Sequence, residues 1–292
     1  MKRSLRILLS AVLTLFVGTN MASAGSIYLS GHDILLHAGQ NGYDAVILDY
    51  LRGAGTGGEI AKASYDVSVV GSGVGAGAFT GQPYGNMGIG VSSGTVVPND
   101  GTLAGYGTTT YYQTGTGADW STILAADTLI ILDHINCGGC DLSDAGVDEI
   151  AANKAAITTS FNAGMDIWGG SGANSADYYA AFLPPSAAAT GASIGASDGF
   201  VATAAGVAIG ITDVDPNSMI NGFPTHNRFS AFDSAFTVFE TREGDGAISI
   251  GLRDAKIIDG GITPGGAVPE PATLLLLGVG LAGLRWAAGR KA

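Results

Sequence analysis

The feature that most constrains the fold of this chain is the order of three segments near its middle. Residues 127–135 (DTLIILDHI) form a nearly continuous apolar run, which is typical of a strand buried on both faces of a sheet. Residues 142–164 follow with the marks of a helix, because Ser143 can cap its start, acidic residues fill the first turns and a glycine ends it. Residues 165–170 (MDIWGG) predict another strand. This order predicts an α/β fold with a parallel core.

Further segments extend the same alternation. The pattern predicts helices at 37–53 and 174–183, and strands at 25–29, 64–73, 206–211, 236–242 and 247–254. We therefore expect a mainly parallel open sheet flanked by helices, similar to flavodoxin-like folds, in which the late strands could form an antiparallel edge.

A glycine-rich stretch interrupts this pattern. Eighteen glycines lie between residues 53 and 117, and each glycine costs about 1 kcal/mol of helix propensity. Regular helices are therefore excluded there, and we expect loops and short irregular strands in an insertion at about 71–118.

The first residues have the composition of a secretory signal peptide. Basic residues precede a 12-residue apolar stretch at 7–18, and Ala22-Ser-Ala24 offers a small-x-small cleavage site. We expect cleavage after Ala24, since the apolar stretch is shorter than the ~20 residues of a membrane-spanning helix. The predicted organisation is a signal peptide at 1–24, an α/β body at 25–262, a linker at 263–271 and a hydrophobic helix with a basic tail at 272–292.

The charge of the body excludes one class of partner. Residues 25–271 contain 7 basic and 25 acidic residues. Because nucleic acid needs a basic surface, we expect no nucleic-acid partner. An acidic, lysine-poor surface suits a secreted soluble domain.

Two cysteines, Cys137 and Cys140, occur together in the sequence NCGGC. In an exported protein this pair predicts a local disulfide. A redox-active pair and a metal site remain alternatives, but the two intervening glycines favour a loop, and no second ligand cluster follows.

Polar residues follow several of the predicted strands, where open α/β sheets bind ligands. His32 with Asp33, and His134 with Asp133, could bind a metal, although histidines in loops more often form ordinary hydrogen bonds. Residues 213–217 (DVDPN) begin like a calcium loop but lack its glycine and distal glutamate, which favours a plain turn. We therefore expect neither a metal nor another cofactor.

The sequence GGSGA at 169–173 lies between a predicted strand and a predicted helix. Small residues around Ser171 fit a nucleophile elbow, whose tight turn strains the serine backbone. A glycine-rich turn with a helix-capping serine is the alternative. The arrangement resembles the class I glutamine-amidotransferase-like superfamily over about 26–250, which implies Ser171 as nucleophile, His226 as base and Glu240 as the residue that orients the base. The amidotransferase cysteine and a His-x-Glu pair are absent.

The last segment has the length and charge of a marginal membrane span. Residues 272–284 are uncharged and would form a helix of about 20 Å, or about 26 Å if the helix continues to Ala288. The hydrocarbon core measures ~30 Å, so the helix could span it only with some thinning. Pro269 and Pro271 break any helix just before this segment and keep the peptide extended there.

Together with its apolar segment and basic end, the triplet Pro269-Glu270-Pro271 resembles the PEP-CTERM sorting signal of exopolysaccharide-producing Gram-negative bacteria. The resemblance implies an exosortase as partner, transient membrane anchoring by the C-terminal helix, and delivery to the cell surface or extracellular matrix, with exopolysaccharide as a further partner. It implies nothing about the body.

The sequence leaves two possible functions of the body. The first is a non-catalytic role at the surface or in the matrix, which the glycine-rich insertion and the incomplete catalytic set favour. The second is a secreted serine hydrolase of the amidotransferase-like superfamily.

Overall fold

The computed structural model describes residues 24–32, 42–56, 58–72, 94–95, 105–134, 142–172, 178–222, 225–259 and 261–264. Its centre is a block of five adjacent parallel strands in the order β4-β2-β5-β6-β1. The bounds of these strands are β1 Gly25–Ser30, β2 Val67–Gly71, β4 Thr109–Gln113, β5 Thr128–Ile131 and β6 Asp166–Gly169.

Antiparallel strands continue the sheet on both sides of this block. On one side β3 pairs with β4, and on the other side β11, β10 and β8 follow β1. Strands β12 and β9 also pair with β11, and β7 pairs with β9. The bounds are β3 Gly94–Thr95, β7 Ala189–Ala196, β8 Phe200–Ala202, β9 Thr225–Phe232, β10 Thr237–Arg242, β11 Gly246–Ile258 and β12 Gly261–Pro264. The α/β class is thus confirmed, but the expected mainly parallel sheet is wrong, because the 12-stranded sheet is mixed.

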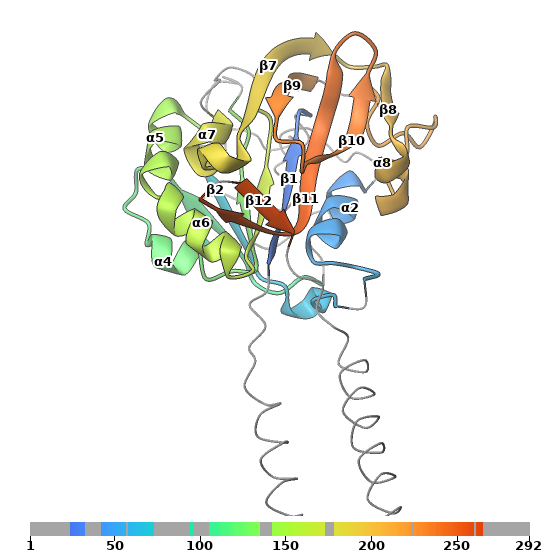
Figure 1. Ribbon diagram of the computed structural model, residues 1–292. Coiled ribbons are helices and arrows are strands. Elements are labelled where there is room, and N and C mark those ends of the chain that lie inside the picture. The colour runs from blue at the N-terminus through green and yellow to red at the C-terminus, as the bar shows by residue number, and fades with distance from the viewer. Residues whose placement is uncertain are drawn as a thin grey trace, which may run out of the picture. The chain divides into compact units, whose positions relative to one another are not determined.

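Helices cover both faces of the sheet (Figure 1). The short helices α4, α5, α6 and α7 lie on one side, and α2 and α8 lie on the other. The bounds are α2 Tyr43–Leu51, α4 Trp120–Ile123, α5 Asp144–Ala152, α6 Lys154–Asn162, α7 Tyr178–Phe182 and α8 Ala204–Ile209, with 3₁₀ turns η1 Lys62–Ser64 and η3 Pro185–Ala187.

Each face of the sheet has its own apolar core. Tyr28, Ile130 and Trp168 point to the side of α2, where they pack with Ile47 and Leu48. On the other side, residues of α5, α6 and α7 pack against the alternate residues of the same strands, among them Ile27, Leu29, Ile131 and Ile167. This alternation follows from the two-residue period of a strand, and burial on both faces explains the continuous apolar runs of the central strands.

Several predicted elements differ in the structure. The single helix expected at 142–164 is two helices, α5 and α6, separated at Asn153. Residues 206–211, predicted as a strand, contain most of helix α8. Strand β9 has no counterpart among the predicted elements, and β4 lies within the predicted glycine-rich insertion.

Candidate functional site

The carboxyl ends of three neighbouring parallel strands gather several of the predicted polar residues. Ile27 of β1 is in register with Ile167 of β6, and Ile131 of β5 is in register with Gly169. His32, Asp133, His134 and Ser171 follow these strands directly and therefore lie at one edge of the sheet, where open α/β sheets bind ligands.

Ser171 is fixed through its backbone. Its N–H donates to Oδ1 of Asp133, and its carbonyl accepts the N–H of His134 at 2.8 Å. A Cβ atom at Gly170 would overlap the Asp133 carboxylate, so only glycine allows this close approach. The Ser171 side chain is fully buried, and its Oγ has no hydrogen-bond partner among the described residues.

The backbone of Ser171 is not in the left-handed region. A nucleophile elbow holds its nucleophile in a strained turn. In the described part of the chain, Asp254 is the only non-glycine residue with a positive φ, at 48°. The roles predicted for Ser171, His226 and Glu240 remain predictions, but the observed backbone of Ser171 gives them no support.

Tyr178 and Tyr179 of α7 close the edge next to Ser171. The Tyr179 hydroxyl accepts the N–H of Gly172 at 3.3 Å and lies 3.1 Å from the Gly170 carbonyl, which accepts its proton. Asn227 of β9 donates its amide to the same hydroxyl at 3.0 Å. The Tyr178 hydroxyl donates to the carbonyls of the β5 end. Two tyrosines thus bind the backbone of this edge from one side.

His226 precedes Asn227 in β9, where it is half-buried. Neighbouring side chains of a strand point to opposite faces. Because Asn227 uses its face to reach Tyr179, the side chain of His226 starts from the opposite face, away from the tyrosine that binds the backbone beside Ser171.

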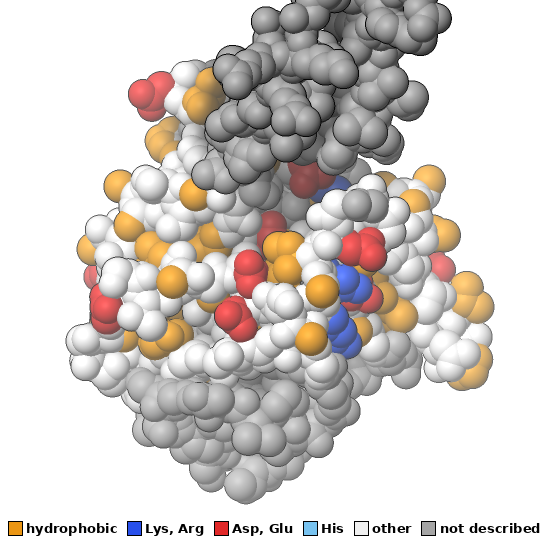
Figure 2. Space-filling view, turned by 90° about the horizontal axis from the view of Figure 1, so that it is seen from below, with side chains coloured by type: hydrophobic (Ala, Val, Ile, Leu, Met, Phe, Trp, Pro, Cys, Tyr) orange, Lys and Arg blue, Asp and Glu red, His pale blue; other side chains and the backbone are white. Residues whose placement is uncertain are grey.

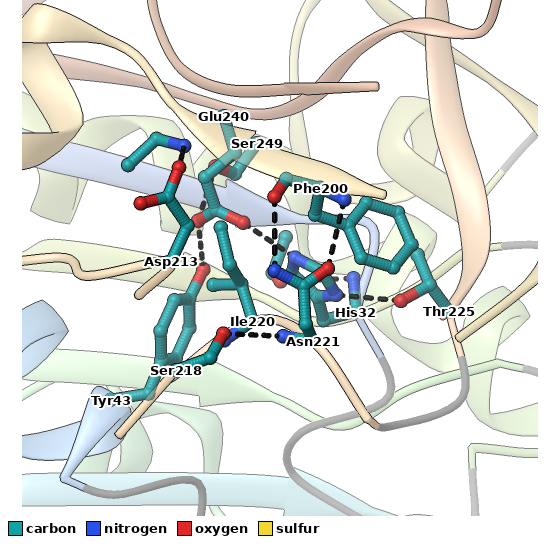
Figure 3. A network of polar contacts seen from close by, with 12 residues as sticks. His32, Tyr43, Phe200, Asp213, Ser218, Ile220, Asn221, Thr225, Glu240 and Ser249 are labelled. Carbon is teal, nitrogen blue, oxygen red and sulfur yellow. Dashed lines mark hydrogen bonds and ion pairs between the residues drawn. The ribbon is translucent and has the colours of Figure 1, made fainter. Parts of the chain in front are cut away.

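Glu240 of β10 is the centre of a second polar cluster (Figure 3). Its carboxylate is fully buried and accepts a hydrogen bond from Nε2 of His32 at 2.5 Å. Three hydroxyl groups donate to its other oxygen, those of Tyr28 at 2.8 Å, Tyr43 at 2.5 Å and Ser249 at 2.7 Å. The imidazole that contacts Glu240 is thus that of His32, which sequence reasoning did not pair with it.

The protonation of this cluster follows from its contacts. Burial alone would raise the pKa of the Glu240 carboxyl, but the nearby His32 and the hydrogen bonds from His32, Tyr43 and Ser249 outweigh burial and lower it. Burial, together with the Glu240 charge, raises the pKa of the Tyr28 and Tyr43 hydroxyls well above the usual value. Both tyrosines therefore stay protonated and donate to a charged carboxylate.

Residues of β8 and β9 hold His32 in place. Its Nδ1 lies 2.6 Å from the Thr225 hydroxyl, and its ring meets the Phe200 ring edge-on, with centroids 4.8 Å apart (Figure 3). Asn221 binds both backbone groups of Phe200, its side-chain oxygen accepting at 2.9 Å and its amide donating at 3.0 Å. The His32 ring is thus enclosed by β1, β8 and the start of β9.

Residues 213–217, which begin like a calcium loop, form hydrogen bonds within the fold. The Asp213 carboxylate accepts the N–H of Ala202 in β8 at 3.0 Å, and Asn217 N–H donates to the Val214 carbonyl at 3.0 Å. This agrees with the alternative of a plain turn. Within the described ranges, no group of three or more His, Cys, Asp or Glu side chains could hold a metal ion.

The contacts of His134 are not those with the metal that its sequence position allowed. Its Nε2 contacts Oδ1 of Asp144, in the first turn of α5, at 2.9 Å, and its ring stacks on Tyr178 at an interplanar angle of 15°. Its Nδ1 has no hydrogen-bond partner among the described residues. Asp33, predicted beside His32 as a possible ligand, lies outside the described residues.

Four further predictions concern residues that the structure does not describe. They are the signal peptide at 1–24, of which only Ala24 is described, the disulfide between Cys137 and Cys140, the motif Pro269-Glu270-Pro271, and the hydrophobic helix at 272–292. No helix in the part of the chain that is described has the length and apolar character needed to cross a membrane.

The described surface agrees with the acidic composition. Figure 2 shows acidic side chains spread over one face and interspersed with hydrophobic ones, with few basic side chains among them.

Sequence reasoning missed Tyr28, Tyr43, Tyr179 and Ser249. Tyr28 and Ser249 carried one usable signal, since each is a polar or amphipathic residue inside an apolar strand, where a buried hydroxyl needs a partner. No local pattern marks the other two.

A single comparison with known proteins gives a match. The family model of the PEP-CTERM protein-sorting motif matches residues 267–291. No curated protein and no solved structure matches the chain. The matched segment contains the Pro-Glu-Pro triplet, the apolar stretch and the basic residues that follow. The chain therefore carries a PEP-CTERM protein-sorting motif, which supports export through exosortase-type sorting and direction to the cell surface.

Proposed function

We propose that this protein is released at the cell surface or into the exopolysaccharide matrix after sorting, and that its α/β body acts there without catalysing a reaction. The sorting motif at 267–291 supports the destination. The observation that carries the non-catalytic part is the state of Glu240, which is fully buried and occupied by four donors.

A fully buried carboxylate that accepts hydrogen bonds from four protein donors is suited to stabilising the fold and not to taking part in a reaction. A residue that orients a catalytic base must hold an imidazole that reaches the nucleophile. Glu240 holds His32, whose second nitrogen is bound to Thr225. The backbone of Ser171, whose φ is not positive, lends the serine hydrolase alternative no support.

A labelling experiment on the exported chain tests this proposal. A fluorophosphonate probe, which reacts with activated serines, is expected to label the wild type no more than the Ser171→Ala variant. Cell fractionation should recover the wild type in the surface or matrix fraction. Labelling of the wild type that Ser171→Ala abolishes would establish the hydrolase instead, and recovery of the wild type only in the periplasm would contradict the destination.

A further inference from the structure

The carboxyl of Asp166, at the start of β6, is buried beside other acidic groups. It is 4% exposed and accepts hydrogen bonds from the Ser26 N–H and the Tyr65 hydroxyl, both at 2.6 Å. Burial is the main cause of its raised pKa, and the two charged groups that act on it, Asp254 and Asp127, raise it further. A carboxyl in such surroundings is stabilised in its charged form by any positive charge that comes near.

The predicted cleavage of the signal peptide produces a positive charge at this place. Hydrolysis of the peptide bond after Ala24 leaves a carboxylate on the signal peptide and an amine on Gly25, which binds a proton at neutral pH. In the uncleaved chain the same nitrogen is a neutral amide. Processing thus adds a charge one residue before Ser26, whose N–H contacts Asp166.

The distance between the new charge and the carboxyl is limited by covalent geometry. The backbone nitrogens of neighbouring residues are joined by three bonds and lie less than about 4 Å apart. Because the Ser26 nitrogen is 2.6 Å from Oδ1 of Asp166, the Gly25 nitrogen lies within about 7 Å of that oxygen. Salt screens charges at this separation only weakly where they are partly buried.

Contacts within the body hold Gly25 in position. Strand β1 pairs with β6 on one side and with β11 on the other, where Gly25 is opposite Ala255. A Cβ atom at residue 25 would overlap the Met165 carbonyl oxygen and the Phe161 ring, so only glycine fits there. Ala24, by contrast, is half-buried. Its removal leaves Gly25 in place and makes room for the protons of an ammonium group.

We propose that removal of the signal peptide after Ala24 creates an ion pair between the α-ammonium group of Gly25 and the Asp166 carboxylate. The pair makes the folded body more stable after processing than before it. In the uncleaved chain the Asp166 carboxyl, with a pKa of about 8, keeps its proton at pH 7. In the processed chain it gives up this proton and becomes the anion of the pair.

Urea unfolding of the exported chain tests the ion pair. The test variant carries two serines inserted between Ala24 and Gly25, which keeps the cleavage site but moves the α-ammonium group two residues away. At pH 7 the insertion should lower the equilibrium constant of folding by about tenfold, because the displaced charge no longer stabilises the Asp166 carboxylate. At pH 4 the two chains should be equally stable, since the carboxyl then keeps its proton in both.

Two further variants identify the partner of the ammonium group. In an Asp166→Asn chain the insertion should leave stability at pH 7 unchanged. In an Asp148→Asn chain, where the substituted residue is exposed on α5, the insertion should have its full effect. N-terminal sequencing should find Gly25 as the first residue of the wild type and the two serines before it in the insertion variant.

Three results would overturn the inference. They are a processed chain that begins at a residue other than Gly25, equal stability of the wild type and the insertion variant at pH 7, and an effect of the insertion that persists in Asp166→Asn. None of these results changes the labelling or the fractionation of the chain, which test the proposed function independently.

Discussion

At the residue scale, Glu240 shows how a buried charge is kept. Its carboxylate lies in an apolar core yet stays ionised, because one imidazole and three hydroxyls donate to it. These donors come from β1, α2 and β11 and from His32, two residues after the end of β1, while Glu240 itself lies in β10. A single side chain thus connects elements that are far apart in the sequence, and its loss affects all of them.

Replacing Glu240 with glutamine is expected to lower the free energy of unfolding at pH 7 by about 3–5 kcal/mol, since the substitution leaves a buried imidazole without its charged partner. Urea unfolding measures the change. Glu243→Gln is the matched control, because Glu243 is exposed at the turn after β10. Equal stability of the wild type and Glu240→Gln would contradict the role given to this cluster.

The contact between Glu240 and His32 also predicts that the stability of the protein depends on pH. The folded state lowers the pKa of Glu240 below its usual value of 4.5, so its contribution to stability is complete above that value and is lost as the pH falls through the lowered folded pKa. The stability difference between the wild type and Glu240→Gln should therefore shrink in acid. A difference that stays constant from pH 7 down to pH 3 would speak against a charged carboxylate.

Asp166 at the start of β6 is expected to behave in the opposite way. Burial raises its pKa from 3.8 to about 8, although hydrogen bonds from Tyr65 and Ser26 partly oppose this. The folded state holds the proton more tightly than the unfolded chain. The carboxyl therefore contributes stability at low pH that is lost progressively as the pH rises from about 3.8 through about 8.

Asp166→Asn should accordingly be more stable than the wild type at pH 9, by an amount on the order of a few kcal/mol, and close to it at pH 4. An asparagine can still accept the Ser26 N–H and contact the Tyr65 hydroxyl. Urea unfolding at both pH values measures the difference, with the exposed Asp148→Asn as control. A variant less stable than the wild type at pH 9 would refute the expectation.

At the element scale, the turn after β1 depends on close backbone approach. A Cβ atom at Gly31 would overlap the backbone oxygens of Asn227 and Ile248, which belong to neighbouring strands and cannot move aside. Gly31→Ala is therefore expected to destabilise the body by about 1–3 kcal/mol. Gly195→Ala is the control, because no atom lies within 4 Å of its added Cβ. Thermal unfolding of both variants measures the difference, and equal melting temperatures of Gly31→Ala and Gly195→Ala would contradict the prediction.

The sequence predicted the central elements because their signals are local. Each of β1, β5 and β6 combines an apolar run with burial on both faces, and Ser143 caps α5 by accepting the Gly146 N–H, as its position indicated. Helix α8 was mistaken for a strand because six small and apolar residues fit both periods. Its ends were the better signal, with Thr203 as N-cap and Gly210 in the left-handed conformation after it.

The candidate site was predictable only as a location. The rule of the carboxyl edge placed His32, Asp133, His134 and Ser171 together, since each follows a strand of the parallel block. The partner of His32 could not be found in this way. Glu240 lies 208 residues further along the chain, and the contact exists only because β1, β11 and β10 pair in that order. The sequence contains the residues of this contact but no local sign of the pairing.

At the scale of the whole molecule, the sorting motif and the body are separate in the sequence, because the motif begins after the last described strand. Replacing Pro269, Glu270 and Pro271 by alanine is expected to prevent processing, so that an unprocessed, membrane-held form accumulates. Immunoblots of cell fractions detect this by the size and location of the chain. The control carries alanine at Val214, an exposed residue of the body. Equal processing of the triple variant and the wild type would contradict the prediction.

The pairing of β1 with β11 determines when the body can fold. Gly25 of β1 lies opposite Ala255 of β11. The first strand therefore has both of its neighbours, β6 and β11, only after most of the chain has been made. Contacts at such sequence distances form slowly, since the entropy of closing the loop is lost before the contact stabilises anything. We therefore expect the sheet to be completed only once the residues around Ala255 are available, which would favour export of this chain before its body has folded.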